Sequence, residues 1–522
     1  MDVEATARPE SRPGLTRRQA VVTLGVVAAG SAAAVAVVAA NSTPPAKLRM
    51  PSSSTLLSAD LLLHLARRAS FGLTPGLAAE ISEQGPEEWL ESQLDPDGVD
   101  DPVLDDLLTG YPLIGKSVEE LRALSTTEWR AASDELVEAT LARQLWSRRQ
   151  LFEIMVDFWS NHFNVTTPLR ATLTAKPVED ATVIRRHALG TFENLLLADA
   201  QSPAMLIHLG NAESRGDDPN ENYGRELLEL HTVGVEAGYT EDDVRDSAYA
   251  LTGWGVGDDG LFAFSADAHY TGPLQVMSWS AANAESADGL AVGTDYLRHL
   301  AYHKSTARHL SHKLAVRFVS DDPPETLVDS LAASFLAAGT AIVPWLRTLF
   351  SSPEFAASTG QKVRRPLEDV VASVRALGIG PPPADRTSGI EALLERSRAL
   401  GQAPLGAGAP TGYPDVEAGW LSTSAVLGRW NVHRLLTTGS FDDFDYPGLV
   451  ATVQSVEPET QGELVDGLCL MLTGQTFQRS HRRALLTFLD ADEDTPYDED
   501  AVSGRLPDLF ALILDSPYHL LR

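Results

Sequence analysis

The sequence predicts a mainly α-helical protein, on three observations. Apolar residues recur every three or four positions along most of the chain, as at Leu141, Leu145 and Phe152, and this is the period of an amphipathic helix. Long stretches of strict alternation, which would indicate strands, are absent. Glycine and proline fall between the helical stretches. We therefore expect a large helical, bundle-like body with one small β-hairpin or loop insertion around residues 253–293.

The first forty residues differ from the rest of the chain. Arg17 and Arg18 precede an uncharged apolar run that extends from Ala20 to Ala40, which predicts a signal peptide of the twin-arginine type. Ala20 stands where that pattern prefers a large apolar residue, so the general secretory route is the alternative. The run is also nearly long enough to cross a bilayer, and an uncleaved N-terminal anchor would be the protein's one attachment to a membrane.

Composition limits the organisation and the functions expected for the rest of the chain, residues 41–522. Residues 41–54 are rich in Ser, Thr and Pro, which indicates a linker, and the folded domain is expected over residues 55–522, as one body or as two lobes. We expect an exported protein of the cell envelope or the extracellular space. A net charge of −31 disfavours binding to nucleic acid. The single cysteine, Cys469, excludes an intrachain disulfide, so the fold must depend on its core.

Polar chemistry concentrates in one predicted helix, which begins at Asn220 as N-cap. The helix carries these polar side chains within a Leu-rich segment: Asn222, Arg225, Glu226, Glu229 and His231. A solvated acidic face is the plain interpretation, but carboxylates and an imidazole on one helix are also what general acid–base catalysis requires. A second helix is expected after Thr240, with Asp243 as its capping partner.

Two other histidines bear on the same question. His162 continues the apolar stripe of a predicted helix, and His187 follows two arginines. Together with Asp157 they make a histidine and carboxylate set of the type that binds a divalent metal such as zinc, manganese or iron when helices bring it together. The alternative is that each histidine is a core or capping residue held in a structural ion-pair network.

Segments along nearly the whole chain resemble one known family. They are LARRASFG (65–72), FWSNHF (158–163), RRHALGTFENLLL (185–197), PNENYGRELLELHTVGV (219–235), GYTEDDV (238–244), ALTGW (250–254), KSTARHLSHKLAVRFV (304–319), KVRRPLEDVV (362–371) and GYPDV (412–416). They closely resemble the signature of the exported bacterial "domain of unknown function 1800" family. The resemblance implies no activity, because the family's biochemistry is unassigned. It implies a partner, because the family's genes commonly neighbour those of another exported family.

Two functions follow as hypotheses. The first is a metal-assisted hydrolase acting on envelope or extracellular material. Its candidate residues are, for catalysis, Glu226, Glu229 and His231; for substrate binding, Asn222, Arg225, Asn161 and Trp254; and for the metal, His162, His187 and Asp157. The alternative is a non-catalytic envelope protein that binds or matures another exported protein. The sequence names no substrate.

Overall fold

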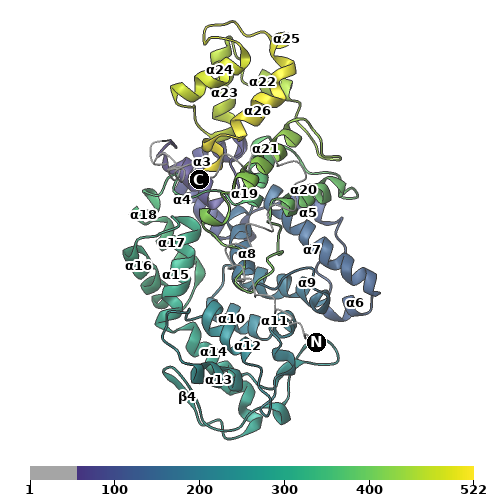
Figure 1. Ribbon diagram of the computed structural model, residues 1–522, viewed down its shortest axis with the longest axis vertical. Helices are drawn as coiled ribbons and strands as arrows, with labels where there is room; N and C mark the ends of the chain where they lie inside the picture. The colour runs from purple at the N-terminus through teal and green to yellow at the C-terminus, as the bar shows by residue number, and fades with distance from the viewer. Residues whose placement is uncertain (1–55) are drawn as a thin grey trace, which may run out of the picture. The chain divides into compact units, whose positions relative to one another are not determined.

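The computed structural model describes residues 56–522 (Figure 1). The predicted signal peptide, its anchoring alternative and the linker lie outside these described residues. The described residues belong to one unit by their internal contacts. Within the described part of the chain, no helix combines the length and the apolar character needed to cross a membrane.

The prediction of a mainly α-helical protein is confirmed. The helices of the first half, short 3-10 and π turns (η) included, are α2 (Leu61–Ala69), α3 (Pro75–Gln84), α4 (Pro86–Leu94), η2 (Pro96–Gly98), α5 (Pro102–Leu108), α6 (Val118–Arg122), α7 (Thr126–Trp146), α8 (Gln150–His162), η3 (Arg170–Thr172), α9 (Ala175–Glu179), η4 (Asp180–Arg185), α10 (Phe192–Ala200), α11 (Pro203–His208), η5 (Asn211–Glu213), α12 (Glu221–Glu226), η6 (Leu227–His231) and α13 (Glu241–Ala250).

The second half is also helical. It contains η7 (Ala266–Ala268), η8 (Ser286–Asp288), α14 (Gly289–Ala301), α15 (Lys304–Phe318), α16 (Glu325–Ala337), α17 (Ile342–Phe350), α18 (Pro353–Ala356), α19 (Pro366–Ala376), α20 (Ser388–Ala399), η9 (Glu417–Gly419), α21 (Thr423–Thr437), α22 (Leu449–Gln454), α23 (Gln461–Thr473), α24 (Arg479–Leu489), α25 (Glu499–Val502), η10 (Ser503–Arg505), α26 (Leu506–Leu514) and α27 (Pro517–Leu520). Helices α15, α16 and α17 lie side by side (Figure 1).

The predicted β insertion is present as two small antiparallel sheets. In the first, β1 (Trp254–Val256) pairs with β2 (Phe262–Phe264). In the second, β3 (Leu274–Val276) pairs with β4 (Trp279–Ala281), which is labelled in Figure 1. Both hairpins follow α13, and their strands are too short to cover a core of their own. They therefore act as an accessory to the helical body.

Local signals explain most of the helix boundaries. The side chain of Thr240 accepts from the backbone N–H of Asp243, and the Asp243 carboxylate accepts from that of Thr240, so the predicted capping box of α13 is confirmed. One boundary was not expected. The apolar stripe of residues 138–163 is divided between α7 and α8, because the chain is extended at Ser147, whose hydroxyl donates to Asp101 at 2.6 Å. That buried hydrogen bond satisfies a polar group at the break.

Helix α19 is the centre of the core. Pro366 occupies its first turn, and every residue from there to Ala376 is buried. The helix contacts α7, α20, α21 and α23, and Gly72 approaches it so closely that a Cβ would lie 2.6 Å from the Cα of Ala372. Glu368 and Asp369 belong to this buried helix. Their charges must therefore find partners inside the protein.

Candidate functional site

The signature helix changes character along its length. The Asn220 side chain accepts from the backbone N–H of Asn222, so the predicted N-cap is confirmed. After Glu226 the α-helix becomes a π-helix, Leu227–His231, and His231 ends it with only 1% of its surface exposed. Such wide turns are rare and recur at functional sites. The π-turn directs the imidazole of His231 into the core.

The charged residues of this helix face the other way. Arg225 forms a bidentate pair with Glu241 at 2.6 and 3.1 Å and lies 3.7 Å from Glu229. Glu226 and Glu229 are partly exposed, and burial raises the pKa of Glu226 from its usual value. Asn222 is exposed, and its side-chain amide donates to the carbonyl of Leu209, at the end of α11, at 3.1 Å. Arg225, Glu229 and Glu241 thus form an ion-pair network on the outer face of α12 and η6.

His231 and His162 do come together in the core. The Nε2–H of His162 donates to the carbonyl of His231 at 3.1 Å, and Nδ1 of His162 accepts from Nζ of Lys313 at 2.8 Å. Burial, and then the Lys313 ammonium, hold the pKa of His162 well below its usual range, and the same two causes lower the pKa of His231 to about 3. Both imidazoles are therefore neutral at pH 7.

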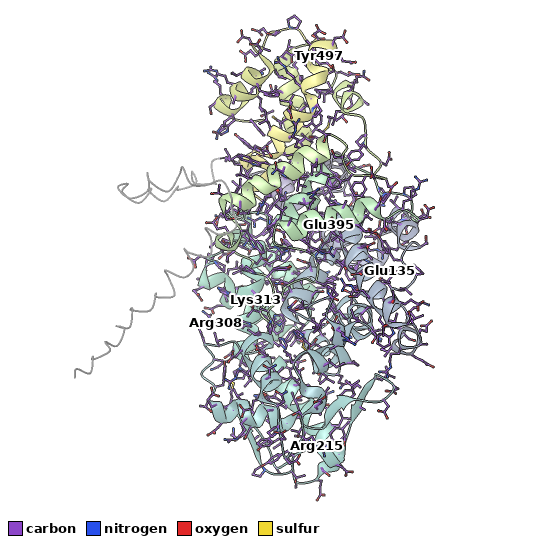
Figure 2. All side chains as sticks on the ribbon, turned by 45° about the vertical axis from the view of Figure 1, so that its right-hand side comes forward. Glu135, Arg215, Arg308, Lys313, Glu395 and Tyr497 are labelled. Carbon is purple, nitrogen blue, oxygen red and sulfur yellow. The ribbon has the colours of Figure 1, made fainter. Side chains whose placement is uncertain are left out.

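Lys313 is the exceptional group of this cluster. It belongs to α15 and is partly exposed, and Figure 2 labels it near the middle height of the molecule. Among the described residues no carboxylate lies within 4 Å of its Nζ, and its close partner is the neutral His162. Burial lowers its pKa to about 8, opposed by the more distant Asp415. An amine with such a pKa can accept a proton near neutral pH.

A surface cavity reaches toward the cluster through His309. The His309 ring lies 6.4 Å from that of His162, centroid to centroid, and burial lowers its pKa to about 4. Its Nε2–H donates to the Leu230 carbonyl at 3.3 Å. The cavity has a volume of about 510 Å³ and is also lined by Gly234, at the end of the signature segment, and by the exposed His312. Of the three imidazoles of the cluster, only that of His309 lines this cavity.

A buried ion network adjoins Lys313. Asp157 accepts from Arg365 at 2.6 Å, Arg365 also bonds Glu368 at 3.0 Å, and Arg317 pairs with Glu368 and lies 3.5 Å from Asp415. Arg317, Arg365 and Glu368 are each at most 4% exposed. Removing one member of such a network leaves an uncompensated buried charge, which costs about 3–5 kcal/mol. The Asp157 carboxylate, a candidate metal ligand, is thus already paired with the Arg365 guanidinium.

The end of the chain closes this network. Arg522 lies 3.3 Å from Glu368, and Lys362 pairs with Asp321 and donates to the Asp415 carbonyl at 2.6 Å. The backbone N–H of Arg522 donates to the carbonyl of Lys362. The last residue is therefore part of the polar centre, by which we mean His162, His231, His309, Lys313 and this ion network.

Asn161 joins the polar centre to the loop that carries Asp415. Its amide donates to the carbonyl of Tyr413 at 2.9 Å and accepts from the backbone N–H of the same residue at 2.7 Å. Gly412 has φ 70°, and a Cβ there would lie 2.3 Å from the Asn161 carbonyl, so only glycine fits this approach. Asn161 thus positions a loop by backbone contacts.

Two of the candidate residues, His187 and Trp254, lie outside the polar centre. His187 is partly exposed beside Arg186, and it makes no hydrogen bond to His162 or Asp157 in the described structure. Trp254 is fully buried against Phe262, 5.4 Å between ring centroids, so it is a core side chain. The ligand atoms of His162, His187 and Asp157 do not converge in the described residues.

One group with metal-ligand chemistry was missed by sequence reasoning. Within residues 56–522, the one such set of three whose ligand atoms lie within 4.8 Å of one another is Asp369, His433 and His519. Both nitrogens of His433 are engaged, Nε2 with Asp369 at 3.0 Å and Nδ1 with Asp515 at 2.7 Å. These carboxylates raise the pKa of His433 to about 9. An imidazolium has no lone pair for a metal, so this group is an ion-pair network.

A second group of buried polar side chains is formed by residues of α9, α10 and α12. Lys176 pairs with Glu179 at 2.6 Å, both fully buried. Asp199 is fully buried, neither of its carboxylate oxygens has a partner among the described residues, and burial raises its pKa well above the usual value. The hydroxyl of Tyr223 is also buried without a described partner. Asp199 is therefore a buried carboxyl without a partner among the described residues, and ionising it costs more than in water.

Comparison with known proteins gives one match. A family model described as "Protein of unknown function (DUF1800)" matches residues 64–521. No curated protein and no solved structure matches the chain. The polar centre draws on the segments that carry the resemblance, since it joins residues of 158–163, 219–235, 304–319, 362–371 and 412–416. Because the model covers most of the chain, the protein is a member of the DUF1800 family of proteins of unknown function.

Proposed function

We propose that the protein is an exported hydrolase acting on envelope or extracellular material, and that the polar centre is its catalytic site. The observation that supports this is Lys313, a partly exposed amine hydrogen-bonded to a neutral imidazole, with its pKa lowered to about 8. A purely structural lysine is usually paired with a carboxylate. A lysine with a lowered pKa is a candidate functional group.

The proposed hydrolysis depends on proton transfer to and from the Lys313 amine. The neutral Lys313 amine takes a proton from a water molecule as the water oxygen bonds to the electrophilic atom of the scissile bond. The resulting ammonium then returns that proton to the leaving group as the bond breaks. His162 holds the Lys313 amine in place, because its other nitrogen is fixed on the His231 carbonyl.

The metal-assisted form of this hypothesis is less well supported. A metal on His162 would have to displace the carbonyl of His231 or the amine of Lys313, and Asp157 would have to leave Arg365. The candidate ligands therefore do not fit a metal without a rearrangement. We assign the proton transfer to Lys313, and we assign no catalytic role to Glu226 or Glu229.

The test compares Lys313→Met and Lys313→Arg with Lys304→Met, an exposed lysine on the same helix. The proteins are incubated with isolated envelope material and with chromogenic esters, glycosides and phosphate esters. We expect activity that rises with pH to half its maximum near about 8, is lost in both Lys313 variants and is retained in Lys304→Met. Unchanged turnover in a folded Lys313→Met variant would refute the proposal.

The non-catalytic alternative has one observation in its favour. Val235, which lines the 510 Å³ cavity, is 66% exposed, so its apolar side chain is free to contact a protein that binds over this cavity. If the protein binds or matures an exported partner there, Val235→Asp will abolish the interaction while Lys313→Met leaves it intact. The hydrolase proposal expects the opposite ranking of the two variants.

A further inference from the structure

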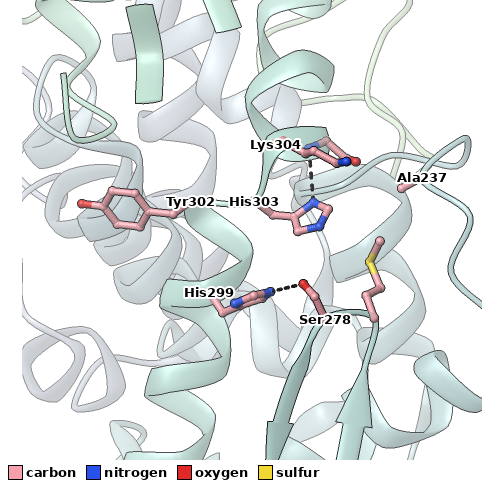
Figure 3. Close-up of a pocket in the computed structure, with 8 residues that line it drawn as sticks. Ala237, Ser278, His299, Tyr302, His303 and Lys304 are labelled. Atoms are coloured by element: carbon pink, nitrogen blue, oxygen red, sulfur yellow. Dashed lines mark hydrogen bonds between the residues drawn. The ribbon is translucent and has the colours of Figure 1, made fainter. Parts of the chain in front are cut away.

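The cavity of about 610 Å³ between the β3–β4 turn and the junction of α14 with α15 has two histidines in its lining (Figure 3). Nε2 of His299 is hydrogen-bonded to the Ser278 hydroxyl at 3.1 Å, and Nδ1 of His303 accepts from the backbone N–H of Ser305 at 3.2 Å. These imidazoles already have partners within the protein, so we assign no ligand to them.

A second cavity, of about 570 Å³, lies between α7 and α20, which contact each other. Two guanidinium groups line it, those of Arg130 and Arg398, and so do the apolar residues Ala131, Pro168 and Leu394. Its lining also carries five carboxylates, those of Asp134, Glu135, Glu138, Glu391 and Glu395. Glu135 and Glu395 are labelled in Figure 2. We call this the acidic cavity, and none of its residues belongs to the polar centre.

Like charges lie close together in the acidic cavity. Burial, and then the carboxylates of Glu391, Asp134 and Glu135, raise the pKa of Glu138 to about 7, opposed by Arg398. Among residues 56–522 the Glu138 carboxylate forms no hydrogen bond and no ion pair. Uncompensated like charges weaken folding, and a cation that binds only the folded protein would relieve them.

The arginines of the lining do not neutralise these charges. Arg130 is paired with Asp134 at 3.0 Å. Arg398 is exposed, and no carboxylate of the described chain lies within 4 Å of its guanidinium nitrogens. The other four carboxylates of the acidic cavity are therefore without a cationic partner at contact distance.

Tyr111 gives an independent indication of a ligand. It lines the acidic cavity, only 2% of its surface is exposed, and its hydroxyl has no hydrogen-bond partner among the described residues. Burial, and then the carboxylates of Glu138, Glu135 and Glu391, raise its pKa, so the hydroxyl lies on the side of the carboxylates. A buried hydroxyl without a partner is costly, and a ligand with a hydrogen-bond donor would satisfy it.

We propose that the acidic cavity binds a linear polyamine. Its carboxylates do not hold three ligand atoms within 4.8 Å of one another, as a metal site would. A volume of about 570 Å³ is instead that of a site for a small organic molecule. Ammonium groups spaced along an alkyl chain can reach several separate carboxylates with charge-assisted hydrogen bonds, while the methylene groups lie on the apolar part of the lining.

The experiment titrates the full chain with spermidine by calorimetry at about 0.15 M NaCl, which screens diffuse attraction to the acidic surface. We expect one saturable equivalent. Glu138→Gln should weaken its affinity by about tenfold, and Tyr111→Phe by about threefold. The control is Glu88→Gln, an exposed glutamate of α4 outside the acidic cavity.

The melting temperature provides a second measurement. Glu138→Gln removes a like charge and Tyr111→Phe an unpartnered hydroxyl, so neither should lower the melting temperature of the free protein. Spermidine should raise that of the wild type and of Glu88→Gln by equal amounts, and that of Glu138→Gln by less.

Three results would overturn the proposal. Equal weakening in Glu138→Gln and Glu88→Gln would mean diffuse attraction to an acidic protein. Displacement of spermidine by an equal concentration of calcium chloride would make the acidic cavity a metal site. Tighter binding of a trilysine peptide than of spermidine, lost in Glu138→Gln, would assign the acidic cavity to the side chains of a basic peptide.

Discussion

Replacing His433 by glutamine removes a buried positive charge from the ion-pair network in the core. His433 is 2% exposed and lies between Asp369, at 3.0 Å, and Asp515, at 2.7 Å. Glutamine is similar in size and retains a hydrogen-bond donor, but it cannot carry the charge. The variant therefore tests the electrostatic contribution of the network rather than its packing.

The expected loss of folding free energy in His433→Gln follows from the pKa of His433. The two carboxylates raise it from 6.5 to about 9, and a shift of this size corresponds to about 3 kcal/mol of folding free energy. Because the folded pKa is higher than the unfolded one, this stability is fully present below pH 6.5 and is lost as the pH rises through about 9. For a unit of about 470 residues the unfolding entropy converts this free energy into about 3 °C of melting temperature.

The assay is the melting temperature of wild type and variant at pH 6.5 and pH 10. We expect a deficit of at least about 3 °C in His433→Gln at pH 6.5, and a much smaller one at pH 10. Other groups that titrate in this range, Lys313 among them, cancel in the difference. His519→Gln is the control, since burial lowers the pKa of His519 to about 3 and it is neutral at both pH values. An equal deficit at both pH values would refute the assignment of a charged His433.

Three other substitutions test the packing and the buried polar groups. Gly224→Ala should destabilise the protein by about 1–3 kcal/mol, seen as a lower melting temperature, because the new Cβ would lie 2.7 Å from the backbone nitrogen of Ala248. Asp199→Asn should leave the melting temperature at pH 7 unchanged or raise it, because an unpartnered carboxyl with a raised pKa weakens folding at neutral pH; a large decrease would mean that Asp199 is ionised and paired. Asn161→Ala should increase hydrogen exchange at the backbone N–H of Tyr413 without changing the pKa of Lys313, and unchanged protection would contradict the positioning role of Asn161.

The position of the polar centre explains why its residues were hard to assign from the sequence. Lys313, Arg317 and Asp415 all stand within segments that carry the family resemblance, yet each is an ordinary charged residue on a helix or loop. Nothing local distinguishes a lysine that faces solvent from one that faces a buried imidazole. Contacts such as that of Lys313 with His162, 151 positions apart, exist only once distant helices pack.

The candidate helix shows the same limit. Its N-cap, Asn220, was predicted correctly because a cap depends on neighbouring residues. The π-turn from Leu227 to His231, which directs the His231 imidazole inward, was not predicted from the sequence pattern. Glu226 and Glu229 lie on the outer face of the helix, so carboxylate content alone did not indicate which side would be buried.

By itself the sequence determined the features that depend on interactions between neighbouring residues. The helical period of apolar residues established the mainly α-helical class, turn-forming residues located the β insertion, and the capping pair of Thr240 and Asp243 specified the start of α13. The tertiary structure alone decided which polar groups are buried together. It set His162 against Lys313 and His433 between two carboxylates, because desolvation and pairing across more than sixty positions are properties of packed helices and not of any one segment.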